Sequence, residues 1–162
     1  MNRLKRYIAL GCMIVIAYFL QTVIFPNLIY QTPNVLLIIV VFMGLMNEQM
    51  TGIIIGFITG LLLDSTYGSV FGVYSIIYMM IGFISGLYHR NFYGKSFLLP
   101  VFLLAVMDLF YGIIIYLLYF FINHGVYIMN YFKIIMIPET IYTVLFGILM
   151  YHIMYYINDR TL

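Results

Sequence analysis

The residue best placed to do chemistry in this sequence is an aspartate within an apolar stretch. Asp108 is the only charged residue of the apolar run 97–122. At 1.5 Å per residue, its carboxyl lies roughly 18 Å along a helix, near the middle of a bilayer. A carboxylate there costs about 2.5–3.5 kcal/mol on insertion scales, so it must face other helices and be protonated or partnered. Gln21, Thr22 and tyrosines of other runs are candidate partners, and Gln21 with Asp108 forms a candidate intramembrane polar site.

Three roles remain open for Asp108. It can be a neutral, hydrogen-bonded packing group, a proton or ion site, or a contact with another subunit. A single carboxylate with no relay partner in the sequence does not distinguish between these roles.

A stripe of small residues is the second feature with a physical meaning. Gly52, Gly56 and Gly60 recur every four residues and are followed by Asp64 and Gly72. Small residues at this spacing let helix backbones approach closely, which is how helices associate within lipid. These five residues are therefore candidates for internal helix packing or for contact with a partner helix. Asp64 is expected in the turn that precedes the next apolar run.

The last apolar run has a recognisable start. Pro138 suits the first helical position, where its missing N–H leaves no hydrogen bond unmade. Glu139 follows at the second position, where the positive end of the helix dipole favours a carboxylate.

No catalytic or cofactor-binding constellation is found. His89, His124 and His152 are far apart in the sequence and make no metal-binding spacing, and Cys12 is the only cysteine. Nucleotide-binding glycine loops and nucleophile motifs are missing too. The sequence therefore predicts a protein that is not an enzyme, with no cofactor, no metal site and no nucleic-acid partner.

The composition predicts which elements hold these residues. The chain has 162 residues, of which 65% are hydrophobic and 7% charged. Soluble domains carry about 25% charged residues because a solvated surface needs them. The chain is therefore expected to be an all-α integral membrane protein, with residues 1–162 forming a single transmembrane domain.

Six apolar runs are separated by polar breaks, which predicts a six-helix transmembrane bundle. The predicted spans cover about 7–25, 35–46, 51–63, 70–88, 97–122 and 138–157. Pro26 is expected to close the first span, and 64–69 is expected to be a turn. The second and third runs reach only about 18–20 Å, against a hydrocarbon core of about 30 Å. Six full spans and four spans with a re-entrant hairpin therefore both remain open.

The basic residues predict an orientation with both termini inside. With six spans, the inner segments hold six of the 7 Lys and Arg residues. The inner residues are Arg3, Lys5, Arg6, Arg90, Lys95 and Arg160, and the outer residue is Lys133.

Four sequence segments, in this order, resemble the MreD family of bacterial rod shape-determining proteins. The segments are FLQTVIFP (19–26), TPNVLLIIVVF (32–42), GIIIGFITGLLLD (52–64) with the FG of 71–72, and IPETIY (137–142). In this chain Asn34 stands where that family commonly has Asp. Together the segments extend over nearly the whole chain.

The resemblance implies a role in cell-wall elongation. MreD proteins are multi-pass subunits in the bacterial cytoplasmic membrane that act without catalysis. They associate with MreC and, through it, with the MreB filament and the RodA–transpeptidase wall synthase. The family is also similar in fold to the substrate-binding subunits of energy-coupling-factor vitamin transporters. A substrate-binding membrane subunit of a vitamin transporter is therefore the alternative function.

Overall fold

The computed structural model describes residues 3–28, 31–67, 71–91, 98–123 and 131–159. Within these ranges every regular element is a helix. The elements are α1 (Arg3–Phe19), η1 (Leu20–Ile24), α2 (Phe25–Leu28), α3 (Val35–Met46), α4 (Gln49–Tyr67), α5 (Val73–Leu87), η2 (Tyr88–Asn91), α6 (Leu98–Asn123), η3 (Phe132–Met136) and α8 (Ile137–Asp159). The prediction of an all-helical protein is confirmed for this part of the chain.

Among the described residues, four helical segments are long and apolar enough to cross a membrane. They are Ile8–Leu28, Gln49–Tyr67, Leu98–Leu118 and Phe132–Met154, whereas the apolar helix Val35–Met46 is shorter. These four segments are consistent with the prediction of a helical membrane protein. A total of six crossings stays a prediction.

The short helix α3 is the core of the bundle. All twelve of its residues are buried, and it packs against α1, α4, α5, α6 and α8. A helix that is apolar on every side and only about 18 Å long cannot span lipid alone, but it is stable when other helices surround it. Its short length therefore follows from its central position.

Helix α4 is longer than the apolar run that predicted it. It extends from Gln49 to Tyr67, whereas the expected span was 51–63. The predicted turn at 64–69 is wrong for residues 64–67, which are helical, and residues 68–70 lie outside the described part of the chain. The Ser65 and Thr66 hydroxyls donate to the backbone carbonyls of Leu61 and Leu62, four residues earlier. These side chains are therefore accommodated within the helix.

Two prolines lie inside helices, each preceded by a π-helical segment. Pro26 does not close the first helix, which passes through η1 and ends at Leu28. The last helix begins before Pro138, because η3 (Phe132–Met136) runs directly into α8. A proline removes an N–H and crowds the carbonyl four residues before it, and a wider turn relieves both problems.

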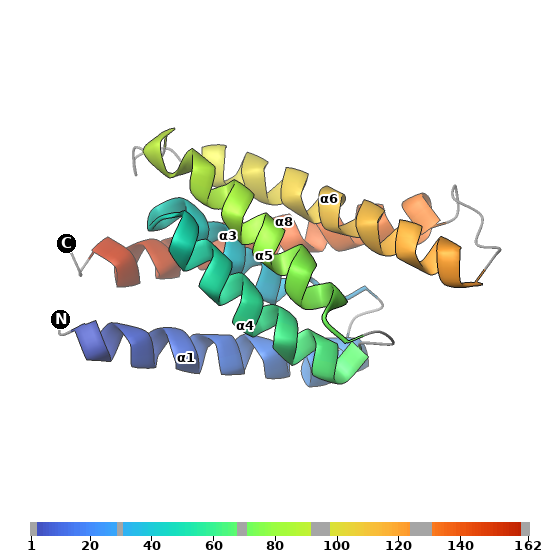
Figure 1. Cartoon of the computed structure of the whole chain (residues 1–162), viewed down its shortest axis with the longest axis horizontal. Coiled ribbons are helices and arrows are strands. Elements are labelled where there is room, and N and C mark those ends of the chain that lie inside the picture. The colour runs from blue at the N-terminus through green and yellow to red at the C-terminus, as the bar shows by residue number, and fades with distance from the viewer. Residues whose placement is uncertain (1–2, 29–30, 68–70, 92–97, 124–130, 160–162) are drawn as a thin grey trace.

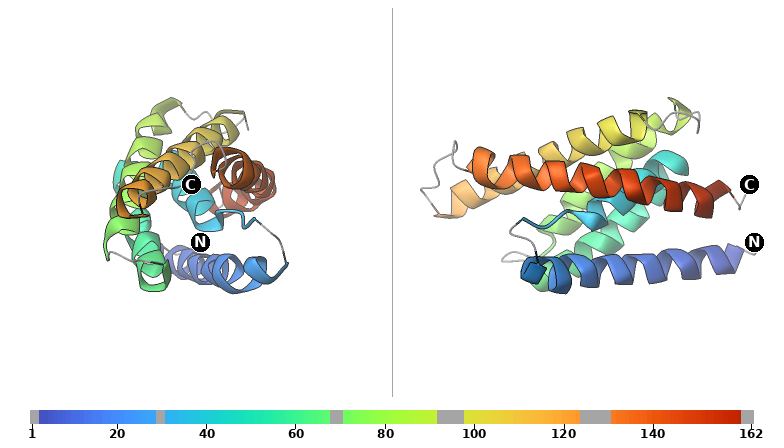
Figure 2. Two further views of the ribbon diagram at one scale, coloured as in Figure 1. Left: turned by 90° about the vertical axis from the view of Figure 1, so that its right-hand side faces the viewer. Right: turned by 180° about the vertical axis from the view of Figure 1, so that it is seen from behind.

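The first and last helices begin and end at the same side of the molecule. The start of α1 and the end of α8 lie together, and the α3–α4 turn and η2 lie toward that end (Figures 1 and 2). We call this the terminal end of the bundle. The shared position agrees with the even number of crossings expected from the basic residues.

Candidate polar site in the helical bundle

Asn34 connects three helices at the start of α3. Its Oδ1 accepts hydrogen bonds from Gln21 Nε2 at 3.2 Å, Tyr78 OH at 2.6 Å and Leu37 N at 3.4 Å. Its own N–H donates to Thr143 Oγ1 at 3.0 Å. Asn34 is 1% exposed. A single buried amide therefore joins η1, α5 and α8 to the first turn of α3.

These contacts allow α3 to begin inside the protein. The first N–H groups of a helix have no partner within the helix, and an unpaired N–H within a membrane protein is costly. Leu36 N donates to Gln21 Oε1 at 2.9 Å, and Leu37 N donates to the Asn34 side chain. Gln21 lies in the π-helical segment η1 and is buried. Side chains of neighbouring elements thus cap a helix that water does not reach.

Asp108 lies deep in the bundle on α6. It is 2% exposed, and its Oδ1 has no hydrogen-bond partner. The Thr140 hydroxyl of α8 is a neighbour of this carboxyl, and it donates to the Met136 carbonyl at 2.9 Å. Two of the partners expected from the sequence have other contacts, because Gln21 contacts Asn34 and Leu36, and Thr22 donates to the Tyr18 carbonyl. Gln21 and Asp108 therefore share no direct hydrogen bond.

Glu139 on α8 is the second carboxyl group in this region. The two carboxyl groups interact electrostatically between α8 and α6. Glu139 is partly buried and lies in the first turn of α8, as expected, although η3 continues the helical chain ahead of it. Four tyrosines interact electrostatically with Glu139: Tyr74, Tyr78, Tyr111 and Tyr131. We call these six residues the carboxyl–tyrosine cluster.

The cluster is joined to the Asn34 network by Tyr78. Its hydroxyl donates to Asn34, and its ring packs edge-on against Tyr111 with centroids 5.8 Å apart. Tyr78 is fully buried. On the other side of the cluster, Tyr131 OH donates to the Gly112 carbonyl at 3.4 Å. Polar groups from α3, α5, α6 and α8 thus meet within a largely apolar bundle.

The glycine stripe packs α4 against α5. A Cβ added to Gly52 would lie 2.3 Å from the Gly82 carbonyl oxygen, and one added to Gly56 would lie 2.3 Å from the Tyr78 carbonyl oxygen. A Cβ on Gly60 would lie 2.4 Å from Ser75 Cα. All three contacts involve backbone atoms, so no side chain can move aside. The structure places this stripe at an internal helix crossing.

Asp64 caps α5 from the facing helix. Its carboxylate accepts from Tyr74 N and Ser75 N, both at 3.0 Å, and from Ser75 Oγ at 2.5 Å. It is 3% exposed and belongs to α4. Gly72 precedes α5 at φ +100°, a conformation that favours glycine, and a Cβ there would contact nothing. Gly72 therefore forms a turn and makes no close helix contact.

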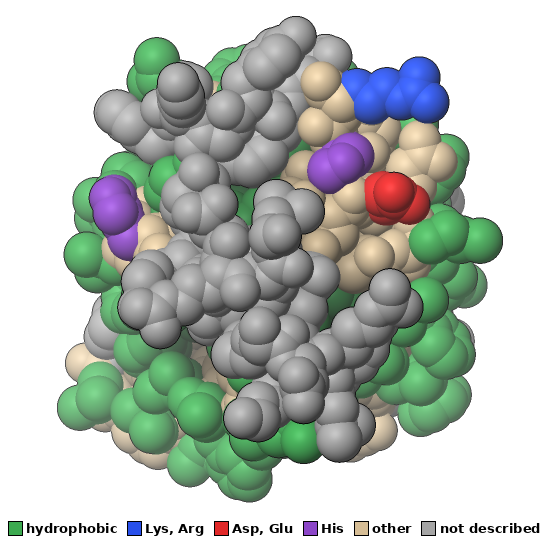
Figure 3. Space-filling view, turned by 90° about the vertical axis from the view of Figure 1, so that its left-hand side faces the viewer, with side chains coloured by type: hydrophobic (Ala, Val, Ile, Leu, Met, Phe, Trp, Pro, Cys, Tyr) green, Lys and Arg blue, Asp and Glu red, His purple; other side chains and the backbone are tan. Residues whose placement is uncertain are grey.

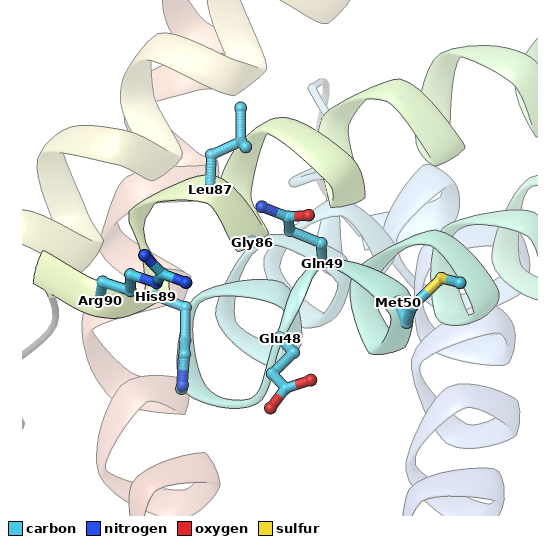
Figure 4. A pocket seen from close by; sticks show the side chains of 7 residues that line it. All are labelled: Glu48, Gln49, Met50, Gly86, Leu87, His89 and Arg90. Atoms are coloured by element: carbon cyan, nitrogen blue, oxygen red, sulfur yellow. The ribbon is translucent and has the colours of Figure 1, made fainter.

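A hollow of about 320 Å³ opens at the terminal end of the bundle. Basic, histidine and acidic side chains gather on this end (Figure 3). Figure 4 shows that the α3–α4 turn, the start of α4, the end of α5 and η2 line the hollow. The lining residues are Glu48, Gln49, Met50, Gly86, Leu87, His89 and Arg90. His89 Nδ1 also lies 2.9 Å from the Leu45 carbonyl, near the end of α3. Side chains of both charge signs, Glu48 and Arg90, thus line this hollow.

The sequence indicated some of these residues and missed others. Gln21, Asp108 and Glu139 were predicted to be polar sites or helix-start residues, and all three face the interior near α3 or α6. Asn34 was noted as a departure from a family pattern and not as the centre of a hydrogen-bond network, and Thr140 and Thr143 were not singled out. A signal did exist for Asn34, because it immediately precedes an apolar run and asparagine is a favoured N-cap. Within the described residues, no three His, Cys, Asp or Glu side chains come together in a metal-binding group.

The comparisons with known proteins give one positive result. A family model described as rod shape-determining protein MreD matches residues 1–159. No curated protein and no solved structure matches the chain.

Proposed function

Because the chain belongs to the MreD family of rod shape-determining membrane proteins, we propose that it is a non-catalytic subunit of the cell-wall elongation complex. It binds an MreC-type membrane protein and helps to organise lateral peptidoglycan synthesis. Through that partner it is linked to the MreB filament and the RodA–transpeptidase wall synthase. It works as a multi-pass protein of the bacterial cytoplasmic membrane. The family match over 159 residues carries this proposal.

The packing of the bundle supports a role as a scaffold. Close backbone contacts between α4 and α5, and a fully buried α3, make a rigid interior. The glycine stripe is covered by α5, so a partner helix must use another surface. Exposed apolar side chains on α4 offer one, with Ile54 57%, Phe57 44% and Ile58 44% exposed.

The test is co-purification of an MreC-type protein with the tagged chain from mildly solubilised native membranes. Gly56→Leu places a large side chain against the Tyr78 backbone and should reduce both the yield and the amount of partner recovered. Gly11→Leu introduces the same residue at a glycine of α1 whose added Cβ would meet nothing within 4 Å, and serves as the matched control. A Gly56→Leu protein with normal yield and a full amount of partner contradicts the scaffold role of this crossing.

A substrate-binding membrane subunit of a vitamin transporter is the second candidate. The convergence of Gln21, Asn34 and Tyr78 favours it, since ligand sites combine apolar walls with a few convergent polar groups. The same purification separates the two functions. Recovery of transport ATPases and a coupling subunit in place of an MreC-type protein would replace the first proposal with the second.

A further inference from the structure

The hollow at the terminal end of the bundle holds two opposite charges that do not pair. Its volume is about 320 Å³, and Glu48 and Arg90 both line it. Figure 4 shows His89 and Arg90 on one side of the hollow and Glu48 and Gln49 on the other, with Gly86 between them. In the described part of the chain neither Glu48 nor Arg90 forms an ion pair. The space between them therefore suits a ligand that carries both a negative and a positive group.

The walls of the hollow are fixed before any ligand binds. A Cβ added to Gly86 would lie 2.4 Å from Gln49 Cα, so the backbones of α5 and α4 are in contact here. His89 Nδ1 lies 2.9 Å from the Leu45 carbonyl oxygen. Because a carbonyl oxygen only accepts, this bond requires the hydrogen on Nδ1 and leaves Nε2 of the neutral ring as an acceptor.

The hollow lies at the level expected for lipid head groups. Helix α4 begins at Gln49, and its 19 residues reach about 28 Å, close to the thickness of the hydrocarbon core. Tyr88 follows α5 directly and is 43% exposed, and tyrosine is enriched at the interface between membrane and water. The polar lining therefore faces the head-group region.

An exposed apolar face continues from the hollow along α5. Its residues recur at intervals of three and four, which places them on one side of the helix. They are Leu87, which lines the hollow, and then Phe83, Met80 and Ile76. An acyl chain can follow this face while its head group occupies the hollow.

We propose that the hollow binds the head group of phosphatidylethanolamine, a phospholipid with a phosphate and a primary ammonium. The Arg90 guanidinium donates paired hydrogen bonds to the phosphate, and the Glu48 carboxylate accepts from the ammonium. His89 Nε2 is a second acceptor for the ammonium. Pockets for small ligands measure about 300–1,000 Å³, so the hollow suits a head group of this size. The site goes beyond the proposed function and does not depend on it.

The two charges have different roles in selecting the lipid. Every phospholipid carries a phosphate, so Arg90 contributes to binding without discriminating. Phosphatidylcholine has no N–H on its quaternary nitrogen, and phosphatidylglycerol has no positive charge. Glu48 therefore favours phosphatidylethanolamine over both.

The experiment counts the lipids bound to the purified, delipidated protein by native mass spectrometry in mild detergent. Dioleoyl phosphatidylethanolamine should bind saturably as one molecule. It should bind roughly tenfold more tightly than phosphatidylcholine or phosphatidylglycerol with the same acyl chains, as one additional charge-assisted contact predicts.

Two variants separate the two charges. Arg90→Gln should weaken the binding of all three lipids by roughly tenfold, whereas Glu48→Gln should weaken phosphatidylethanolamine by that factor and the other two not at all. Lys133→Gln removes a charge from an exposed side chain of η3, outside the hollow, and should bind as the unaltered protein does. Misfolding cannot produce a loss that is confined to one lipid.

Four results would overturn the proposal. Equal binding of the three lipids by the unaltered protein would show that lipid coats the apolar faces without selection. Equal weakening of all three in Glu48→Gln would exclude an ammonium contact. Competition by soluble phosphoethanolamine at the concentration of the lipid would assign the hollow to a soluble ligand. Loss of the MreC-type partner in Arg90→Gln, with lipid selectivity unchanged, would assign it to a polar segment of that partner.

Discussion

At the scale of single residues, Asn34 has hydrogen-bond partners on several elements of the bundle. Its Oδ1 accepts three hydrogen bonds, which an aspartate oxygen can also accept. Asn34→Asp should therefore retain the fold. Asn34→Leu leaves three buried donors without their acceptor and should destabilise the protein by roughly 1–3 kcal/mol for each donor that stays unpaired.

The measurement for Asn34 is the unfolding midpoint of both variants in one detergent. The Asn34→Asp variant also places a third acid close to Tyr78 of the carboxyl–tyrosine cluster. Its unfolding midpoint therefore shows how the protein responds to an added acid at this place. A leucine variant as stable as the unaltered protein would show that the donors find other partners.

Asp64 makes a second prediction at this scale. Its carboxylate accepts three hydrogen bonds at the start of α5, where the helix dipole also favours a negative charge. Asp64→Asn retains the shape but replaces one acceptor oxygen with an NH₂ group that faces N–H donors. We expect a loss of roughly 1–3 kcal/mol, read from the unfolding midpoint. Ser65→Ala, at an exposed neighbouring position on α4, is the control and should change the midpoint little.

At the scale of elements, the α4–α5 crossing depends on glycine at specific positions. Gly52→Ala places a methyl group 2.3 Å from the Gly82 carbonyl oxygen, so the two helices must separate. Overpacking of this kind costs about 1–3 kcal/mol in protein cores. Gly11→Ala on α1 is the matched control, since nothing lies within 4 Å of its added Cβ. Detergent-extracted yield and unfolding midpoint should fall for Gly52→Ala only.

The element scale also shows what the sequence could and could not predict. Three features could be predicted from local sequence patterns and the physics of membranes. They are the helical content, the close packing of the glycine stripe and the buried position of Asp108. The π-helical segments before Pro26 and Pro138 could not be predicted, because a proline in an apolar run usually indicates the end or the start of a helix. The sequence also predicted a turn where residues 64–67 are helical. The reason is that these residues form a polar cluster in the sequence, whereas the contacts of Asp64 with α5 exist only in the folded protein.

The polar site was harder to predict than the helices. Asn34, Tyr78 and Thr143 lie far apart in the sequence and meet only because α3 is central. Hydrophobic periodicity gives no register between helices, so no pattern in one run identifies its partners in another. What the sequence does contain is an N-cap residue before an apolar run, which is sufficient to predict where α3 begins.

At the scale of the whole molecule, the buried helix α3 determines how many times the chain crosses the membrane, because α3 and α4 either both cross or form a re-entrant hairpin. Helix α4 has 19 residues and reaches about 28 Å, close to the thickness of the hydrocarbon core. Helix α3 is shorter, but both of its ends are capped by side chains from other elements, Gln21 at its start and His89 near its end. A helix whose ends are capped in this way needs no contact with lipid. The short length of α3 is therefore compatible with a chain that passes from one side of the membrane to the other at this point.

Cysteine labelling from each side of the membrane tests this directly. In a Cys12→Ser background, single cysteines replace Gln31, Glu48, Ser65 and Arg90, which flank α3, α4 and α5 in turn. If each helix crosses, an impermeant maleimide added outside labels positions 31 and 65, and positions 48 and 90 react only after the membrane is opened. A re-entrant hairpin predicts instead that position 48 is buried at mid-membrane depth and resists labelling from either side. Because Arg90 belongs to the basic set that predicts the inner face, labelling of position 90 from outside would reverse the orientation and move the hollow beside Glu48 to the outer surface.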